Sequence, residues 1–150
     1  MAEFDKVADA EELYRSIRVN SDEYRYDEGK LIFSSQAFVD RNKEPSVDRA
    51  VLLKNNPVKS KRGETDGIVT LVTYDVRCIG DVYSNDDAGL KVNHAVDVIP
   101  RPEPCNESHA QIEVTPEYFG SNNKKNRAFK LLRISLARQA TNNGWTIAPE

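Results

Sequence analysis

The feature that most constrains the fold is an alternation of apolar and polar side chains in the second half of the chain. It occurs in the segments 90–99 and 109–114. Successive side chains of a β-strand point to opposite faces of a sheet, so this period predicts strands that bury one face each. The residues predicted to face inward are Leu90, Val92, His94, Val96 and Val98 in the first segment and Ala110, Ile112 and Val114 in the second.

Further strands are predicted elsewhere in the chain. The segment 68–76 is apolar on both faces in its first half, which is typical of a strand in the middle of a sheet. The short apolar segment 50–53 is predicted to be a buried strand, and 145–147 a short strand near the end of the chain. Together with the alternating segments, these strands favour an antiparallel sheet.

The segment 122–139 predicts a long helix, because its apolar residues recur at helical spacing. Its apolar stripe consists of Ala128, Phe129, Leu132, Leu136 and Ala140. A short helix is predicted over 8–18, where Leu13 and Ile17 stand four residues apart. The sequence therefore predicts an α+β fold, with an antiparallel sheet packed against the long C-terminal helix and a short N-terminal helix before it.

Size and composition favour a single soluble domain. A chain of 150 residues can bury a sufficient core without disulfides, and its net charge of −3 favours solubility. No apolar run approaches the roughly 20 residues of a membrane-spanning helix, and the acidic N-terminus lacks the features of a signal peptide. We therefore expect one cytoplasmic domain over 1–150, without membrane contact, with a loose tail over 1–7 and a mobile basic loop over 55–67.

Short fragments spread along the chain carry a resemblance to known proteins. They are Leu13-Tyr14-Arg15, Ser34-Ser35-x-Ala37-Phe38, Ser46-Val47-Asp48-Arg49-Ala50 and His109-Ala110-x-Ile112. Together they resemble a family of small prokaryotic proteins that has no assigned activity. The resemblance implies a microbial protein that acts as a separate chain, and it brings no catalytic residues with it.

The predicted C-terminal helix carries a basic face. No acidic residue interrupts the run 121–139, and at 100° per residue several cations lie away from the apolar stripe. They are Arg127, Lys130, Arg133 and Arg138, with Ile134 projecting on the same side. Lys59, Lys61 and Arg62 add a second basic segment in the loop. Such positive charge is suited to phosphates or to an acidic partner, although charged helix faces are more often simply solvated.

A candidate catalytic row lies in the segment 109–114. His109, Gln111 and Glu113 share one face of the predicted strand, and a histidine with a carboxylate can transfer protons. The Gln-x-Glu pair also resembles the glutamate motif of ADP-ribosyltransferases, which implies a role for an upstream Arg15 and for Ser34 or Ser35 in holding NAD. The solvent-facing side of an edge strand remains the simpler interpretation of this row.

The soft metal ligands of the chain are Cys78, His94, Cys105 and His109. Cys105 and His109 have workable spacing for zinc, but no Cys-x-x-Cys pair is present. His94 falls on an apolar strand face, where a histidine is more often a buried, hydrogen-bonded residue than a catalyst. If His94 and His109 lie on adjacent strands, they are also candidates for a paired site. We expect no bound metal.

The sequence favours a non-catalytic binding or adaptor domain. It contains no nucleophile elbow, phosphate-binding glycine loop or dinucleotide fingerprint, so we expect no cofactor. The expected partner is a protein or a nucleic acid, which the basic helix and the basic loop would contact. The alternatives are a small enzyme centred on His109 and Glu113, with Arg15 or His94 beside them, and a structural subunit of a larger assembly.

Overall fold

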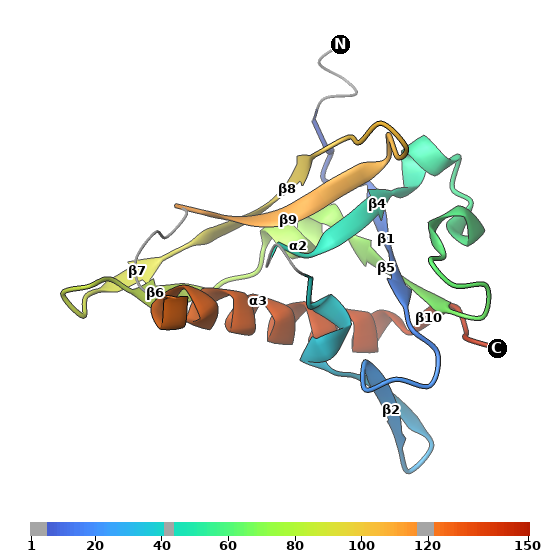
Figure 1. Ribbon diagram of the computed structural model, residues 1–150, viewed down its shortest axis with the longest axis horizontal. Helices are drawn as coiled ribbons and strands as arrows, with labels where there is room; N and C mark the ends of the chain where they lie inside the picture. The colour runs from blue at the N-terminus through green and yellow to red at the C-terminus, as the bar shows by residue number, and fades with distance from the viewer. Residues whose placement is uncertain (1–5, 41–43, 117–121) are drawn as a thin grey trace.

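The fold is built around one antiparallel sheet of six strands (Figure 1). The computed structural model of the protein describes residues 6–40, 44–116 and 122–150, and among these the side chains of 122–126 are not described. In spatial order the sheet consists of β10 (Trp145–Ile147), β5 (Gly67–Val72), β1 (Glu12–Ile17), β4 (Ser46–Arg49), β9 (His109–Thr115) and β8 (Ala95–Pro100). Each neighbouring pair is antiparallel.

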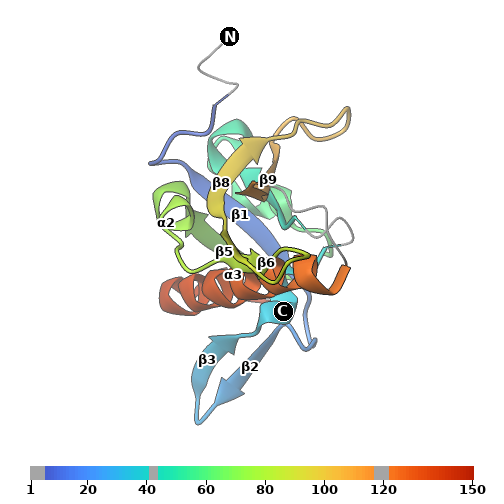
Figure 2. The same ribbon diagram turned by 90° about the vertical axis from the view of Figure 1, so that its left-hand side faces the viewer.

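Helix α3 (Asn122–Asn143) lies along one face of this sheet in both views (Figures 1 and 2). The predicted apolar stripe from Ala128 to Ala140 is buried and packs against inward-facing strand residues such as Leu13 and Ile112 in one core. The predicted α+β class, with its antiparallel sheet and long C-terminal helix, is confirmed. Burial of this apolar surface is the main favourable term in folding.

Smaller elements surround the sheet. β2 (Tyr24–Asp27) and β3 (Lys30–Phe33) form a hairpin that projects beyond α3 (Figures 1 and 2). β6 (Tyr83–Asn85) pairs with β7 (Lys91–Asn93) at one end of the molecule. The short helical elements are α2 (Thr73–Arg77) and the 3₁₀ turns Ser35–Phe38, Ala50–Leu53 and Pro57–Ser60. Among the described residues, no helix has the length and apolar character that crossing a membrane requires.

The predicted helix over 8–18 is wrong, because this segment contains strand β1. Leu13 and Ile17 stand four residues apart, which places them on one face of a helix and equally on one face of a strand. In the structure they face the core together, while Tyr14 is buried on the opposite side with Ala50 and Ile68. β1 pairs with β5 on one side and β4 on the other. Pairing with these neighbouring strands, and not the local spacing, therefore determines that the segment is a strand.

Other boundaries also differ from the predictions. The segment 50–53 is a 3₁₀ turn and not a strand, and it ends at Lys54 in the left-handed conformation. The strand predicted over 68–76 ends at Val72, where α2 begins. The strand predicted over 90–99 is divided into β7 and β8 on either side of His94. The segments 109–114 and 145–147 are strands as predicted.

The two segments predicted to be loose contain ordered contacts. Val7, within the predicted tail, is fully buried in the core; residues 1–5 lie outside the described part of the chain. The loop 55–67 contains the turn Pro57–Ser60, which Asn56 caps through its side chain. Ser60 and Asp66 of this loop are also buried.

Candidate functional site

A polar cavity of about 600 Å³ lies between β1, β4, β9 and the basic loop. Along β4 and β9, the residues Val47, Ala110 and Ile112 belong to the core with α3. Their neighbours Asp48, His109 and Gln111 alternate with them and line the cavity. The alternation of the strands therefore places the cavity on the side of β4 and β9 that faces away from the α3 core.

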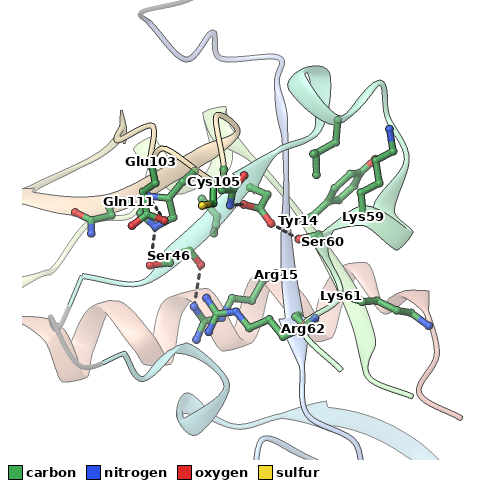
Figure 3. A pocket seen from close by; sticks show the side chains of 16 residues that line it. Tyr14, Arg15, Ser46, Lys59, Ser60, Lys61, Arg62, Glu103, Cys105 and Gln111 are labelled. Atoms are coloured by element: carbon green, nitrogen blue, oxygen red, sulfur yellow. Dashed lines mark hydrogen bonds and ion pairs between the residues drawn. The ribbon is translucent and has the colours of Figure 1, made fainter. Parts of the chain in front are cut away.

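The carboxylate of Asp48 holds two walls of this cavity together. Its Oδ2 accepts a hydrogen bond of 2.5 Å from the Ser60 hydroxyl. Its Oδ1 accepts from the Asn106 amide at 2.8 Å. The Ser108 hydroxyl lies 3.3 Å from the same oxygen and donates at the shorter distance of 2.5 Å to Oδ1 of Asn106. Strand β4, the turn Pro57–Ser60 and the loop before β9 therefore meet on one side chain. Figure 3 shows Ser60 and Cys105 among the side chains that line the cavity.

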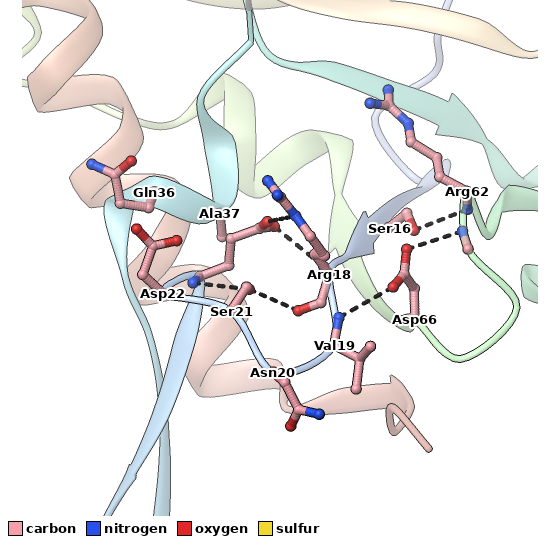
Figure 4. Close-up of polar contacts among 12 residues, drawn as sticks. Ser16, Arg18, Val19, Asn20, Ser21, Asp22, Gln36, Ala37, Arg62 and Asp66 are labelled. Atoms are coloured by element: carbon pink, nitrogen blue, oxygen red, sulfur yellow. Dashed lines mark hydrogen bonds and ion pairs between the residues drawn. The ribbon is translucent and has the colours of Figure 1, made fainter.

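The basic loop is attached to β1 through its backbone (Figure 4). The amide of Arg62 donates to the Ser16 hydroxyl at 3.1 Å. Asp66 accepts from the amides of Gly63 and Val19 at 3.0 and 3.1 Å. A Cβ atom at position 63 would lie 2.8 Å from Oδ2 of Asp66, so glycine lets the loop approach this carboxylate. These contacts fix the backbone from which the Arg62 side chain extends.

The cavity wall carries more positive than negative charge. Lys59, Lys61 and Arg62 line it, and in the described part of the chain the side chains of Lys59 and Arg62 make no hydrogen bond or ion pair. Lys61 donates to the carbonyl of Glu64. The wall carboxylates are Asp48, which already accepts hydrogen bonds from Ser60 and Asn106, and Glu103. The arrangement presents unpaired cationic donors to whatever enters the cavity.

Arg15 reaches the cavity edge, but its guanidinium is committed to the protein. The residue is only 6% exposed. Its Nε donates to the carbonyl of Ala37 at 3.0 Å, and Nη1 donates to the carbonyl of Ser46 at 2.8 Å. Two further bonds, of 2.8 and 3.2 Å, join it to Asp40. Arg15 therefore fastens Ala37, Asp40 and Ser46 to β1 and has little capacity left for an incoming ligand.

Asp40 is the acidic partner of this arginine. Burial alone would raise the pKa of Asp40, but the hydrogen bonds and charge of Arg15, the amide of Ser46 and the charge of Arg62 together hold the pKa below its usual value. The carboxylate is thus kept ionised by the groups around it. Arg62, Arg15 and Asp40 also line a common neighbouring cavity, so the positive charge of Arg62 acts on Asp40 from close by.

The predicted row on β9, His109, Gln111 and Glu113, does not act as one group, because only its first two residues line the cavity. The side chains of His109 and Gln111 line the cavity, as Figure 3 shows for Gln111. His109 accepts from the Ser46 hydroxyl at Nε2 and donates from Nδ1 to the carbonyl of Arg101, which can only accept. Glu113 forms two hydrogen bonds of 2.7 and 2.9 Å with Arg101 and does not line the cavity. The structure thus brings His109 to Arg15 and Gln111 but separates it from Glu113.

His94 lies at the opposite end of the β8–β9 pair from His109. Ala95 pairs with Thr115, whereas Pro100 pairs with Ala110. His94 is buried, and its ring contacts the Ser84 hydroxyl at 2.7 Å and the carbonyl of Pro116 at 2.5 Å. The two histidines therefore do not form a paired site.

The candidate metal ligands are also dispersed. Cys78 ends helix α2, and His94 has both ring nitrogens engaged. Only Cys105 and His109 line a common cavity. Within residues 6–40, 44–116 and 122–150, no group of three or more His, Cys, Asp or Glu residues is arranged to hold a metal ion.

The predicted cations of α3 lie in different environments. Arg127 donates to Asn85 at 3.2 Å and its guanidinium lies over the Tyr83 ring. Arg133 is half-buried, and burial lowers its pKa. Lys130 and Arg138 are exposed. The loop cations Lys59, Lys61 and Arg62, in contrast, all line the polar cavity described above.

No protein-family model, no curated protein and no solved structure matches this chain. Sequence reasoning identified the loop cations from charge alone, but it missed Ser46, Asp48 and Ser60. The only signal was the fragment Ser46–Ala50, which contains an aspartate with no local role. The role of Asp48 depends on Ser60 and Asn106, which lie in other segments of the chain. The sequence does not show that these segments come together.

Proposed function

We propose that the chain is a non-catalytic binding domain that holds a phosphate-bearing ligand in the cavity between β4, β9 and the basic loop. The observation that carries the proposal is the pair of exposed cations, Lys59 and Arg62, that line the cavity without a counter-ion among the described residues. Unpaired cations around a concave polar surface attract anions.

The remaining donors of the cavity suit phosphate chemistry. Lys61 adds a third cation, and the amide of Gln111 supplies a neutral donor without a partner in the described part of the chain. Arginine binds phosphate oxygens through parallel hydrogen bonds, and lysine binds them as a point charge. A cavity of about 600 Å³ has the volume of a typical small-molecule site. The phosphate can belong to a free nucleotide or to a nucleic-acid strand whose backbone enters the cavity.

An enzyme centred on His109 and Glu113 is less well supported. Glu113 is bonded to Arg101 outside the cavity. Arg15 is bonded to Asp40, and His94 lies at the far end of the β8–β9 pair. The cavity carboxylate nearest His109 is Glu103, whose Oε1 lies 4.0 Å from Nδ1, but Nδ1 already donates to the carbonyl of Arg101. Binding is therefore the stronger hypothesis.

The test is a titration of the protein with a fluorescein-labelled single-stranded oligonucleotide, followed by fluorescence anisotropy, and with ATP and pyrophosphate by calorimetry. The variants are Arg62→Glu and Lys59→Glu, and the control is Lys130→Glu on α3. We expect each cavity variant to weaken binding about tenfold or more, or roughly 1.4 kcal/mol, and affinity to fall as salt rises. ATP binding without oligonucleotide binding would assign the free-nucleotide source.

Two results would overturn the proposal. One is the absence of binding of all three probes at low salt. The other is binding that Lys130→Glu weakens while Arg62→Glu and Lys59→Glu leave it unchanged, since this would place the anion on α3. Circular dichroism of each variant shows whether the substitution has altered the fold.

A further inference from the structure

A second surface, independent of the phosphate cavity, lies between the β2–β3 hairpin and α3. Figures 1 and 2 show the hairpin projecting past the helix, and a groove of about 360 Å³ separates the two. We propose that this groove docks an acidic protein segment that inserts one apolar side chain between the hairpin and the helix.

The two faces of the hairpin explain how the groove forms. Tyr24 and Phe33 pair across the hairpin and pack edge-on against Trp145, with ring centroids 5.1 and 4.7 Å from the indole. Lys30 and Ile32 alternate with Leu31 and Phe33 along β3, and both line the groove. The aromatic contacts therefore hold one face of the hairpin and leave the other available.

The base of the hairpin is tied to the helix. The amide of Phe33 donates to the hydroxyl of Thr141 on α3 at 2.9 Å. Both residues line the groove, so this bond closes one end of it. This hydrogen bond fixes the base of the groove, which reduces the entropy that a ligand must lose to order that end of the surface.

The floor of the groove is apolar. Ile32 and Ile134 are half-buried, and Phe33 and Ala137 are buried below them. The volume of about 360 Å³ accommodates one large aliphatic or aromatic side chain. Anchors of this kind, inserted into a desolvated pocket, contribute a large part of the affinity at protein interfaces.

The charge of the rim identifies the occupant. Lys30 and Arg138 are exposed at the groove, and within the described residues neither forms an ion pair. None of the described residues that line the groove is a carboxylate. α3 also has no Asp or Glu anywhere along its length, and exposed Lys130 lies further along it. An apolar floor whose only charged lining residues, among those described, are Lys30 and Arg138 complements an apolar residue flanked by Asp or Glu.

The experiment selects peptides from a random peptide library displayed on phage, using the full chain as the immobilised target. We expect enrichment of sequences that place Asp or Glu beside one Leu, Ile, Phe or Trp. A synthetic peptide from the enriched set is then titrated by fluorescence anisotropy. Arg138→Glu, at an exposed position, is expected to weaken its binding at least tenfold, and Ile134→Ser is expected to do the same.

Arg62→Glu is the matched control, because it removes a cation from the phosphate cavity and leaves the groove intact. Binding of the peptide should be unchanged in this variant, so failure of the phosphate proposal and failure of the docking proposal are distinguishable. The docking proposal is overturned if no acidic–apolar peptides are enriched, or if the selected peptide binds Arg138→Glu as tightly as the unmodified chain. It is also overturned if sedimentation shows a dimer that Arg138→Glu dissociates, since a second copy would then occupy the groove.

Discussion

At the residue scale, the ion pair between Arg15 and Asp40 joins β1 to the segment that leads into β4. Nη1 of Arg15 and Oδ2 of Asp40 are 2.8 Å apart, and both side chains are largely buried. Removing one partner of a buried pair leaves an uncompensated charge, which is far more costly than the loss of an exposed pair. The pair therefore makes the stability of the protein sensitive to any change that neutralises Asp40.

A fall in pH is such a change, because protonation neutralises Asp40 and lowers the free energy of unfolding. The pKa of Asp40 is lowered in the folded protein, so the unfolded chain takes up a proton first as the pH falls below about 4. The contribution of Asp40 to stability is complete above that pH and is lost as the pH falls through the folded pKa. We expect Asp40→Asn to be less stable than the unmodified chain at pH 7 and to show a smaller loss of stability between pH 5 and pH 2.5.

Urea unfolding across this pH range measures the difference. Two parallel curves, displaced by the same free energy at every pH, would show that Asp40 titrates alike in the folded and unfolded chains. That result would contradict the prediction.

At the element scale, the basic loop depends on the glycine that precedes its buried aspartate. A Cβ atom at position 63 would lie 2.8 Å from Oδ2 and 3.0 Å from Cγ of Asp66. The carboxylate cannot retreat freely, because it also accepts from the amide of Val19. We expect Gly63→Ala to destabilise the protein by about 1–3 kcal/mol and to weaken phosphate binding, since Arg62 would be displaced.

Gly80→Ala is the control for this substitution. A Cβ atom at Gly80 meets nothing within 4 Å, so its thermal unfolding midpoint and its ligand affinity should match those of the unmodified chain. Equal behaviour of Gly63→Ala and Gly80→Ala would show that the Asp66 contact does not position the loop.

The elements also show why some predictions from sequence succeeded. Helix α3 and strand β9 were predicted because their apolar residues repeat over a long enough segment. The repeat in α3 fits only helical spacing, and the alternation in β9 fits only a strand. The spacing of Leu13 and Ile17 fits a helix and a strand equally well. The segment forms a strand because it pairs with β4 and β5. His94 stands where β7 and β8 are separated, although the alternation of the sequence continues through it.

The site was less predictable than the fold. Lys59, Lys61 and Arg62 were identified because positive charge is visible in a sequence. Asp48 acts through Ser60, Asn106 and Ser108, and these contacts exist only after the strands have paired. Arg15 was a candidate site residue beside His109 and Glu113, but the fold places its guanidinium against Asp40. Long-range contacts therefore determined both the missed residues and the residue whose role changed.

At the scale of the whole molecule, stability is expected to be uneven. β1 and β5 pair with neighbours on both sides within the large sheet, whereas β2 and β3 pair only with each other. A two-stranded hairpin is marginally stable by itself, and amides in such elements open at lower free energy than those of a central sheet.

Hydrogen exchange followed by mass spectrometry tests this expectation. Backbone amides of β1 and β5 should exchange slowest, and those near the hairpin tip, around Gly29, should exchange many times faster. An acidic segment docked in the groove should slow amide exchange along β3, because residues of β3 line the groove. Uniform protection of the hairpin and the central strands would show that the aromatic contacts with Trp145 make the hairpin part of the core.

The hydrogen bonds of Asp48 have a mechanical consequence for the cavity. Ser60 and Asn106 belong to loops far apart in the chain, yet both are bonded to the same carboxylate. A displacement of either loop is therefore transmitted to the other through a bridge that is two hydrogen bonds long. The wall that carries Lys59 and Lys61 and the wall that carries exposed Cys105 are therefore connected through the carboxylate of Asp48.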